Sequence, residues 1–247
     1  MRKIMNQTIC EVKENLPLTA DVFKMTLIGD TSAITAPGQF VNIKLDGLYL
    51  RRPISVCDVC GDLLTLIYKV VGKGTEQMSK MTHGQKLDLL TGLGNGYDMS
   101  LSGDHPLLVG GGVGVPPLYM LAKELRAKGL RVSVVLGFNK ASEIFYEKEF
   151  ADLGCDVTVT TVDGSYGVCG FVTDALPADY SYFYACGPEP MLRALWRATK
   201  TLGQMSFEER MGCGFGACMG CSCKTLTGNK QICKDGPVMK KEEILWQ

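Results

Sequence analysis

Five cysteines gather near the end of the chain, and four of them have a spacing that can hold iron and sulfide. The run C-x4-C-x2-C, followed twelve positions later by a further cysteine, is the spacing of plant-type [2Fe-2S] ligation. Two ferric ions bridged by two sulfides leave four terminal coordination positions, one for each thiolate. The sequence therefore predicts a [2Fe-2S] cluster with these ligands: Cys213, Cys218, Cys221 and Cys233.

The residues around these ligands help to distinguish an iron-sulfur cluster from a zinc site or a group of buried thiols. Interleaved glycines would let the backbone wrap closely and aim N–H groups at the sulfurs: Gly212, Gly214, Gly216 and Gly220. Zinc sites usually pair their ligands as CxxC…CxxC, which this segment does not, and a group of buried thiols is the remaining alternative. Cys223 as third ligand would give an x4 gap that the ferredoxin-type loop does not use. We therefore expect Cys223 to lie off the cluster or to be a nearby thiol.

The other six cysteines are scattered along the chain. The polar residues from Asn6 onward leave no apolar region for a secretory signal, so we expect the protein in the cytoplasm, where thiols stay reduced. Small buried hydrophobic side chains are the default interpretation for all six: Cys10, Cys57, Cys60, Cys155, Cys169 and Cys186. Cys57 and Cys60 form a CxxC, but no second CxxC follows at zinc-ribbon spacing.

Two motifs in the first part of the chain could bind a flavin nucleotide. Arg52-Pro53-Ile54-Ser55 follows an apolar strand start, where a guanidinium could hold a diphosphate and a hydroxyl could reach an isoalloxazine or ribityl group. Further on, Ile67-Tyr68-Lys69 leads into Gly72-Lys73-Gly74-Thr75 and a helix-like segment, which would place a phosphate at a helix N-terminus. A hairpin turn capped by Thr75 explains the second string equally well by itself.

Two later motifs could bind a dinucleotide. Gly110 to Pro117, with Gly111, Gly112, Gly114 and Pro116, follows a strand and opens a helix, the position that binds a pyrophosphate. Val115 stands where the third glycine of GxGxxG would be, so a tight turn without a ligand is the alternative. Cys186-Gly187-Pro188 offers a second turn at the carboxyl edge of the same sheet, where ligands bind.

Local patterns indicate which elements carry these motifs. Short strands broken by Gly, Pro and Asp are expected at residues 22–28, 39–45, 54–57 and 63–71, which suggests a small antiparallel barrel. After residue 105 we expect strands at 107–109, 131–136, 156–161 and 182–186, alternating with helices at 118–125, 144–153 and 190–202. This alternation is typical of a doubly wound parallel sheet. The rest has little strand or helix period.

The expected architecture is thus α+β and multidomain. It consists of an antiparallel β-barrel at residues 1–98, a doubly wound parallel α/β domain at 99–205 and a small iron-sulfur segment at 206–247.

The 26 basic and 26 acidic residues cancel, so charge does not favour binding to nucleic acid or to an anionic membrane. Two histidines exclude a three-histidine metal site, and the uncharged stretch 105–122 is broken by glycines and prolines, which argues against a membrane helix.

The order of the motifs is more informative than any one of them. RPIS, GxGT, GGGxGxPP and CGPxPM in this order resemble the ferredoxin-NADP reductase superfamily, over nearly the whole chain. Three segments closely resemble the electron-transfer subunits of the NAD-dependent, class 1B dihydroorotate dehydrogenases: Arg51 to Ser55, Met211 to Cys221 and Ile232 to Val238. Ile54 departs from the wider superfamily, many of whose members place an aromatic residue against the flavin there.

The resemblance implies a function. It assigns FAD to Arg52 through Ser55, Ile67 through Lys69, and Gly74 with Thr75, and the cluster to Cys213, Cys218, Cys221 and Cys233. It implies an FMN-containing dihydroorotate dehydrogenase catalytic subunit as partner, in a heterotetramer of two of each, serving pyrimidine (UMP/orotate) biosynthesis. A flavin converts the two-electron chemistry of NAD(H) into single electrons, and no residue of this chain needs a catalytic acid-base role. Electrons must leave for another chain, because we find no second flavin site.

Two other functions compete with this interpretation. A related FAD/[2Fe-2S] reductase subunit of a ferredoxin:NAD(P) oxidoreductase, sulfide dehydrogenase or hydrogenase complex shares the same three-part plan, and fold does not fix the acceptor. A metal-stabilised binding module without redox chemistry is the other. Asn139 and Lys140 follow the second strand of the α/β domain, where a 2′-phosphate would be sensed, but one lysine does not decide between NADH and NADPH.

Overall fold

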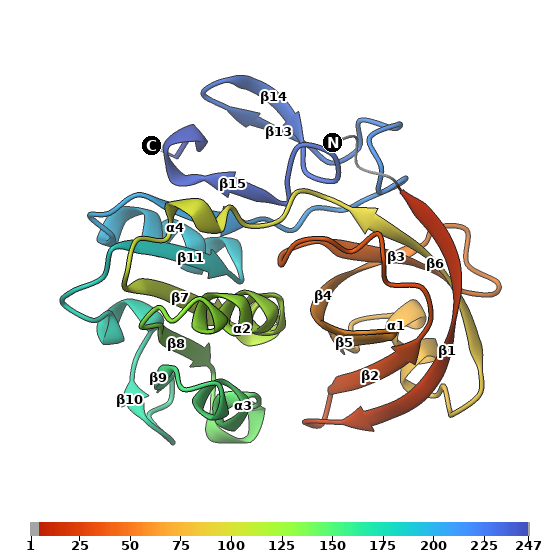
Figure 1. The fold of residues 1–247 in the computed structure, drawn as a ribbon, viewed down its shortest axis with the longest axis horizontal. Coiled ribbons are helices and arrows are strands. Elements are labelled where there is room, and N and C mark those ends of the chain that lie inside the picture. Colours follow the sequence, from red (N-terminus) through yellow and green to blue (C-terminus); the bar gives the residue numbers. More distant parts are fainter. Residues whose placement is uncertain (1–4, 247) are drawn as a thin grey trace.

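The computed structural model describes residues 5–246, so residues 1–4 and 247 of the first and last expected domains lie outside the described part. A barrel and an α/β domain lie side by side, and the C-terminal segment runs across one end of both (Figure 1). This is the expected fold class, and the structure confirms it.

The first domain is a closed barrel with strand order β1-β2-β5-β4-β3-β6, and every neighbouring pair is antiparallel. Its elements are β1 (Asn6–Pro17), β2 (Val22–Ile28), β3 (Phe40–Lys44), β4 (Arg52–Cys60), β5 (Leu63–Lys69), α1 (Lys73–Ser79) and β6 (Lys86–Leu93). Apolar side chains such as Met25, Val41 and Leu66 fill its interior and are fully buried. The expected strands correspond to β2, β3, β4 and β5.

Two barrel strands, β1 and β6, were not expected from the sequence. Strand β1 fully buries only Cys10 and Val12, and its register shifts between Val12 and Glu14 at a bulge. Its other positions are polar or partly exposed, so it lacks the apolar alternation by which strands are recognised.

The second domain is a seven-stranded sheet of order β10-β9-β8-β7-β11-β12-β15, parallel except for β15. Its strands are β7 (Pro106–Gly111), β8 (Ser133–Phe138), β9 (Asp156–Thr161), β10 (Val168–Cys169), β11 (Tyr182–Cys186), β12 (Gly203–Ser206) and β15 (Val238–Lys240). The chain builds β8, β9 and β10 on one side of β7 and then crosses to β11 on the other. This switch point lies between the two strands that carry the expected nucleotide turns.

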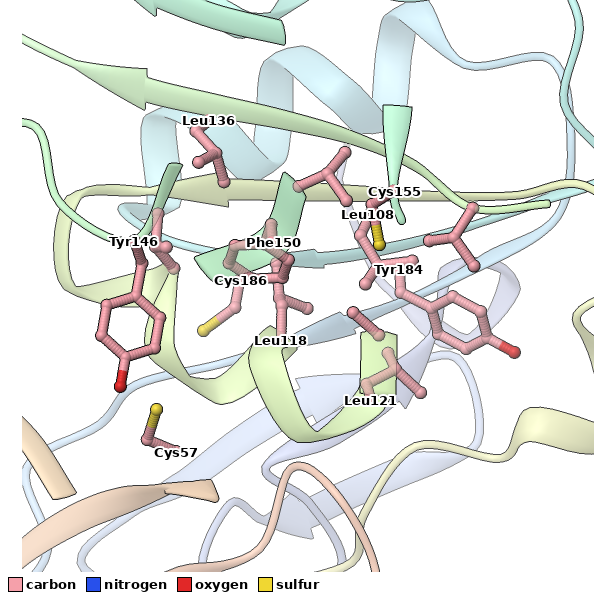
Figure 2. Close-up of a cluster of buried hydrophobic side chains, with 14 of the residues drawn as sticks. Cys57, Leu108, Leu118, Leu121, Leu136, Tyr146, Phe150, Cys155, Tyr184 and Cys186 are labelled. Carbon is pink, nitrogen blue, oxygen red and sulfur yellow. The ribbon is translucent and has the colours of Figure 1, made fainter. Parts of the chain in front are cut away.

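Helices cover both faces of this sheet, as double winding requires. Leu121 of α2 (Tyr119–Ala127) and Phe150 of α3 (Glu147–Asp152) pack on one face, in the core that Figure 2 shows. Leu192 and Leu195 of α4 (Glu189–Ala198) pack on the opposite face. Across residues 5–246, no helix has the length and apolar character needed to cross a membrane.

Short 3-10 turns complete the connections. They span Met99–Leu101, Gly112–Gly114, Pro116–Leu118, Ala141–Glu143, Val172–Ala175 and Lys241–Glu243. Helix α4 ends at Ala198, earlier than expected, and the strand expected at 131–136 lies at Ser133–Phe138.

The C-terminal segment is tied to both domains. It forms a hairpin of β13 (Ser222–Thr225) and β14 (Gly228–Gln231), and its β15 pairs antiparallel with β12 of the large sheet. Each of these strands is too short to show a period in the sequence. The segment therefore extends the nucleotide sheet and is not a free appendage.

Candidate functional site

The two candidate flavin motifs meet on one side of the barrel. The first four residues of β4, Arg52 to Ser55, are half-buried and pair with β3. A Cβ atom at Gly74 would lie 2.3 Å from Nε of Arg52, so this arginine packs directly on the Gly72–Thr75 turn. The structure thus brings together a guanidinium and a turn that are separated by a whole strand in the sequence.

Thr75 stabilises this turn from within α1. Its hydroxyl accepts hydrogen bonds from the backbone N–H groups of Val71, at 2.9 Å, and Gly72, at 3.3 Å. Thr75 therefore caps the helix from its third position and is not the N-cap residue itself, which is Gly72.

The second flavin string lies on β5 and is mostly buried. The ring of Tyr68 lies in the barrel core, and its hydroxyl donates to Oδ1 of Asn15 at 3.0 Å. Burial raises the pKa of Tyr68 to about 12, so the phenol is neutral at physiological pH. Ile67 packs in the core shared with the α/β domain, and Lys69 pairs with Asp21 at 3.1 Å. The side chains of Ile67 and Tyr68 are thus occupied by protein contacts, which leaves the main chain for a ligand.

The two candidate nucleotide turns touch at the switch point of the sheet. A Cβ atom at Gly114 would lie 2.2 Å from the carbonyl oxygen of Cys186, and one at Gly111 would lie 2.5 Å from Sδ of Met191. Glycine is needed at position 114 because the backbone at the end of β11 comes so close, whereas the neighbour of position 111 is the flexible side chain of Met191 on α4. Parallel sheets bind ligands at such a point, outside the carboxyl ends of the strands.

A cavity of about 680 Å³ opens at this edge. Gly111, Gly112, Gly114, Gly187 and Pro188 line it, and Lys69 reaches it from the barrel. Pro116 and Cys186 are buried behind the turns and do not line it. Burial raises the pKa of the Cys186 thiol to about 12, so the thiol is protonated at neutral pH.

Asn139, which the sequence placed after the second strand of the α/β domain, also lines the cavity. Three further lining residues were not expected from the sequence: Glu143, Phe171 and Glu208, which follows the end of β12 at the same edge. The Glu208 side chain keeps contact with solvent, but the surrounding protein desolvates its carboxyl group and raises its pKa. Its position after a strand end is the signal that could have identified it, but the four-residue β12 was not predicted.

The four expected cluster ligands form two pairs. The side chain of Cys218 lies near that of Cys213 and lowers its pKa, and Sγ of Cys221 lies 3.2 Å from Sγ of Cys233. Backbone donors point at both pairs, since Ala217 N–H reaches Sγ of Cys213 at 3.1 Å and Cys233 N–H reaches Sγ of Cys221 at 3.4 Å.

This arrangement fits a two-iron cluster better than a single metal ion. Among residues 5–246, no three or more His, Cys, Asp or Glu side chains converge as one ion requires. A [2Fe-2S] cluster instead needs two thiolates on each iron, which two pairs can supply. Burial by itself would raise the pKa of Cys213, but N–H groups of Phe215, Cys218 and Ala217 outweigh it and bring this pKa to about 6. The loop thus already favours the thiolate that iron needs.

Three further cysteines lie outside these pairs. Cys223 is on β13, opposite Lys230, and packs against the small core that contains Cys221 and Cys233, and burial raises its pKa. Cys57 is fully buried in the core between the two domains, with its thiol facing the hydroxyl of Tyr146 in Figure 2, whereas Cys60 is exposed. The CxxC motif does not form a dithiol pair in this structure.

Comparison with known proteins gives concordant results. Residues 208–245 match the family described as the iron-sulfur cluster binding domain of dihydroorotate dehydrogenase B. The chain is 43% identical to the electron transfer subunit of dihydroorotate dehydrogenase B (NAD(+)) from Fusobacterium nucleatum, over 95% of this chain and 97% of that protein. It is 42% identical to the corresponding subunit from Geobacillus sp. WCH70, over 98% of this chain and 100% of that protein.

Solved structures agree with the fold. An NADH-dependent reduced ferredoxin-NADP oxidoreductase, studied for flavin-based electron bifurcation, is 31% identical with a TM-score of 0.86, over 96% of this chain and 90% of that one. A ferredoxin NADP+ reductase from Neisseria gonorrhoeae, solved with FAD and NADP, is 16% identical with a TM-score of 0.69, over 78% and 89% of the two chains. At that identity the second likeness concerns the fold alone.

Proposed function

Because the chain belongs to the family of electron transfer subunits of dihydroorotate dehydrogenase B (NAD(+)), we propose that it carries electrons between NAD(H) and the FMN of a partner dihydroorotate dehydrogenase subunit. The route is FAD and a [2Fe-2S] cluster, and the pathway is pyrimidine (UMP/orotate) biosynthesis. One observation carries this proposal. The paired cluster cysteines lie against β3, the strand that pairs directly with the proposed flavin strand β4.

The proposed FAD site is the side of the barrel where Arg52 meets Gly74. Arg52 would hold the diphosphate through its guanidinium, which carries a permanent charge and can donate two parallel hydrogen bonds. Pro53, Ile54 and Ser55 continue along the half-buried strand and would lie against the ribityl and isoalloxazine groups. Ile67, Tyr68 and Lys69 would contribute main-chain contacts, and Gly74 with Thr75 would close the phosphate end.

The proposed NAD(H) site is the cavity at the switch point. Gly111, Gly112 and Gly114 allow the dinucleotide to approach the backbone closely, and Gly187 with Pro188 forms the adjoining part of the wall. Lys69 is the cation that reaches this cavity among the described residues that line it. Pro116 and Cys186 would support the two turns from behind, because both are buried.

The proposed cluster site consists of the two cysteine pairs, Cys213 with Cys218 and Cys221 with Cys233. When bound, FAD supplies the exchange between a two-electron hydride donor and a one-electron carrier. The residues of this chain bind and orient the cofactors and shield them from water. None needs to exchange a proton with an organic substrate, so we assign no catalytic acid or base.

An electron transfer subunit works with a catalytic subunit. We propose that this partner contains FMN, that two copies of each chain form a heterotetramer, and that the complex is cytoplasmic. A related reductase subunit of a ferredoxin:NAD(P) oxidoreductase, sulfide dehydrogenase or hydrogenase complex is the second candidate, favoured by the likeness to the NADH-dependent reduced ferredoxin-NADP oxidoreductase.

Affinity purification of the tagged chain from its native host, followed by assays of the captured complex, tests this function. We expect an FMN-containing partner and dihydroorotate-dependent reduction of NAD+ by the complex. The purified single chain should oxidise NADH with artificial dyes but leave dihydroorotate unchanged. Dihydroorotate oxidation by the single chain, or capture of a complex that reduces ferredoxin but not orotate, would contradict the proposal.

A further inference from the structure

The outer face of β3 forms the surface on which the cluster segment rests. Along this strand, Val41 and Ile43 point into the barrel core, as the two-residue period of a strand requires. The alternate residues, Phe40 and Asn42, point the other way but are also buried, at 3% and 1% exposure. The outward face is therefore covered by protein, and the covering element is the C-terminal segment.

Each of these two residues touches one part of the ligand set. Phe40 packs in the small core that contains Cys221 and Cys233. Asn42 donates from Nδ2 to the carbonyl oxygen of Cys213 at 3.1 Å, across a sequence separation of 171 residues. A single strand face thus contacts both cysteine pairs.

Gly214 shows how closely Asn42 approaches the ligand loop. A Cβ atom at Gly214 would lie 2.4 Å from Nδ2 of Asn42, and Gly214 has a φ of +81°, a conformation that favours glycine. The loop is therefore shaped to admit this amide directly beside the cluster ligand.

The proposed flavin strand, β4, is the direct neighbour of β3 in the barrel sheet. Asn42 pairs with Pro53, and Phe40 pairs with Ser55. Only the width of one strand pair separates the residues proposed to contact the flavin from those that contact the cluster ligands. Neighbouring strands lie about 4.8 Å apart.

The chain that follows Cys233, in the second cysteine pair, is also hydrogen-bonded to the barrel. Asn95, which follows β6, donates from Nδ2 to the carbonyl oxygens of Asp235, at 2.8 Å, and Lys234, at 3.2 Å. These carbonyls directly follow Cys233 in the chain. A side-chain amide of the barrel therefore donates to the backbone beside each of the two cysteine pairs.

The amide at position 42 carries a cost in stability beside its hydrogen bond to Cys213. Its Oδ1 atom is buried and has no hydrogen-bond partner within the described part of the chain. Leaving a buried acceptor unpaired is unfavourable, and an apolar side chain of similar size would avoid that penalty. Asparagine at position 42 nevertheless provides the N–H donor to the carbonyl oxygen of Cys213.

We propose that Asn42 is a positioning residue for electron transfer, which holds the Cys213–Cys218 pair at a fixed place over the flavin strand. This inference rests on the proposed function. Without the amide, the cysteine ligands would remain but the loop would lose its attachment to β3. The gap between flavin and cluster would then be less well defined.

Substitution of Asn42 in the flavin- and cluster-loaded chain tests this role. Asn42→Leu keeps the approximate volume and removes the donor, and Asn42→Ser, a second variant in case the first does not fold, is too short to reach Cys213. Lys44→Leu, on the same face of β3 but exposed, is the matched control. Hydrogen exchange of amides 213–217 measures loop attachment, and rapid mixing with NADH under anaerobic conditions resolves flavin reduction from cluster reduction.

We expect both Asn42 variants to exchange these amides about tenfold faster, the effect of losing one buried hydrogen bond. Flavin reduction by NADH should keep its wild-type rate, cluster reduction should slow, and Lys44→Leu should match the wild type throughout. Unchanged exchange, unchanged cluster reduction, or equal slowing of both steps would overturn the inference while leaving the proposed function intact. A wild-type chain purified without flavin or iron would overturn both.

Discussion

A Cβ atom at Gly114 would lie 2.2 Å from the carbonyl oxygen of Cys186, so the two nucleotide turns are in direct backbone contact. Gly114→Ala must therefore push β11 and the glycine turn apart. We expect the variant to lose about 1–3 kcal/mol of stability, as overpacked sites do, together with most of its NADH-to-dye activity. Thermal unfolding and steady-state kinetics measure the two effects.

A substitution at Gly112 can test ligand binding at the same turn without straining the protein. Its φ is +52°, and a Cβ atom there would meet nothing within 4 Å. Asparagine tolerates this conformation, so Gly112→Asn should unfold at the wild-type temperature but show a raised KM for NADH, because its side chain would occupy space needed by the dinucleotide. A wild-type KM would show that the dinucleotide does not approach this turn.

Arg52 is expected to be essential for holding FAD. Loss of a charged, bidentate phosphate contact removes about 1.5–3 kcal/mol of binding free energy, which is roughly a ten- to hundredfold rise in Kd. Arg52→Ala should therefore lose flavin during gel filtration. Arg131→Ala, which removes an exposed arginine paired with Asp156 at 3.0 Å, should retain it. Full flavin occupancy in Arg52→Ala would refute the assignment.

Five single cysteine variants test the ligand assignment. Serine at Cys213, Cys218, Cys221 or Cys233 should remove or strongly destabilise the cluster, because each pair would then offer one thiolate too few. Cys223→Ser is the matched control and should retain iron. NADH-to-dye activity should largely survive in all five, since hydride transfer does not need the cluster. Iron content and reduced-state EPR decide, and an intact signal in Cys221→Ser with loss in Cys223→Ser would contradict the assignment.

The buried Cys57 predicts a specific loss of stability in alkali. Burial raises its pKa from 9.0 to about 12, so below pH 9.0 both folded and unfolded chains keep the proton. Between these values only the unfolded chain releases it, and the free energy of unfolding falls by about 1.4 kcal/mol per pH unit. Cys57→Ala lacks this contribution. Urea unfolding below and above pH 9.0 should show a shallower decline in the variant, and equal declines would exclude the effect.

Much of the fold followed from local pattern. The strands at Val22–Ile28, Asp156–Thr161 and Tyr182–Cys186 have the expected bounds, because each is a compact apolar or β-branched run. The strands β13, β14 and β15 could not be predicted, since three or four residues are too few for a period. They form because β15 extends an existing sheet and the hairpin bonds to the C-terminal residues, with the N–H of Leu226 donating to the carbonyl oxygen of Glu243.

For the candidate sites too, the sequence predicted some features and only the fold revealed others. Cysteine spacing and glycine-rich strings are local, so the sequence indicated which residues to consider. The role of Asn42 depends on a hydrogen bond to a residue 171 positions away, and no local signal marks it. The packing of Arg52 on Gly74 is likewise a tertiary contact. Spacing identifies chemistry, whereas the distances between chemical groups come only from the fold.

Anaerobic titration of the purified single chain with NADH, followed by visible absorption and EPR, tests the central claim most directly. The account predicts that NADH bleaches a flavin band and then produces the EPR signal of a reduced [2Fe-2S] cluster, without any partner or dihydroorotate. A chain whose flavin is reduced while no cluster signal develops, or one that contains zinc in place of iron, would contradict the proposed path of electrons.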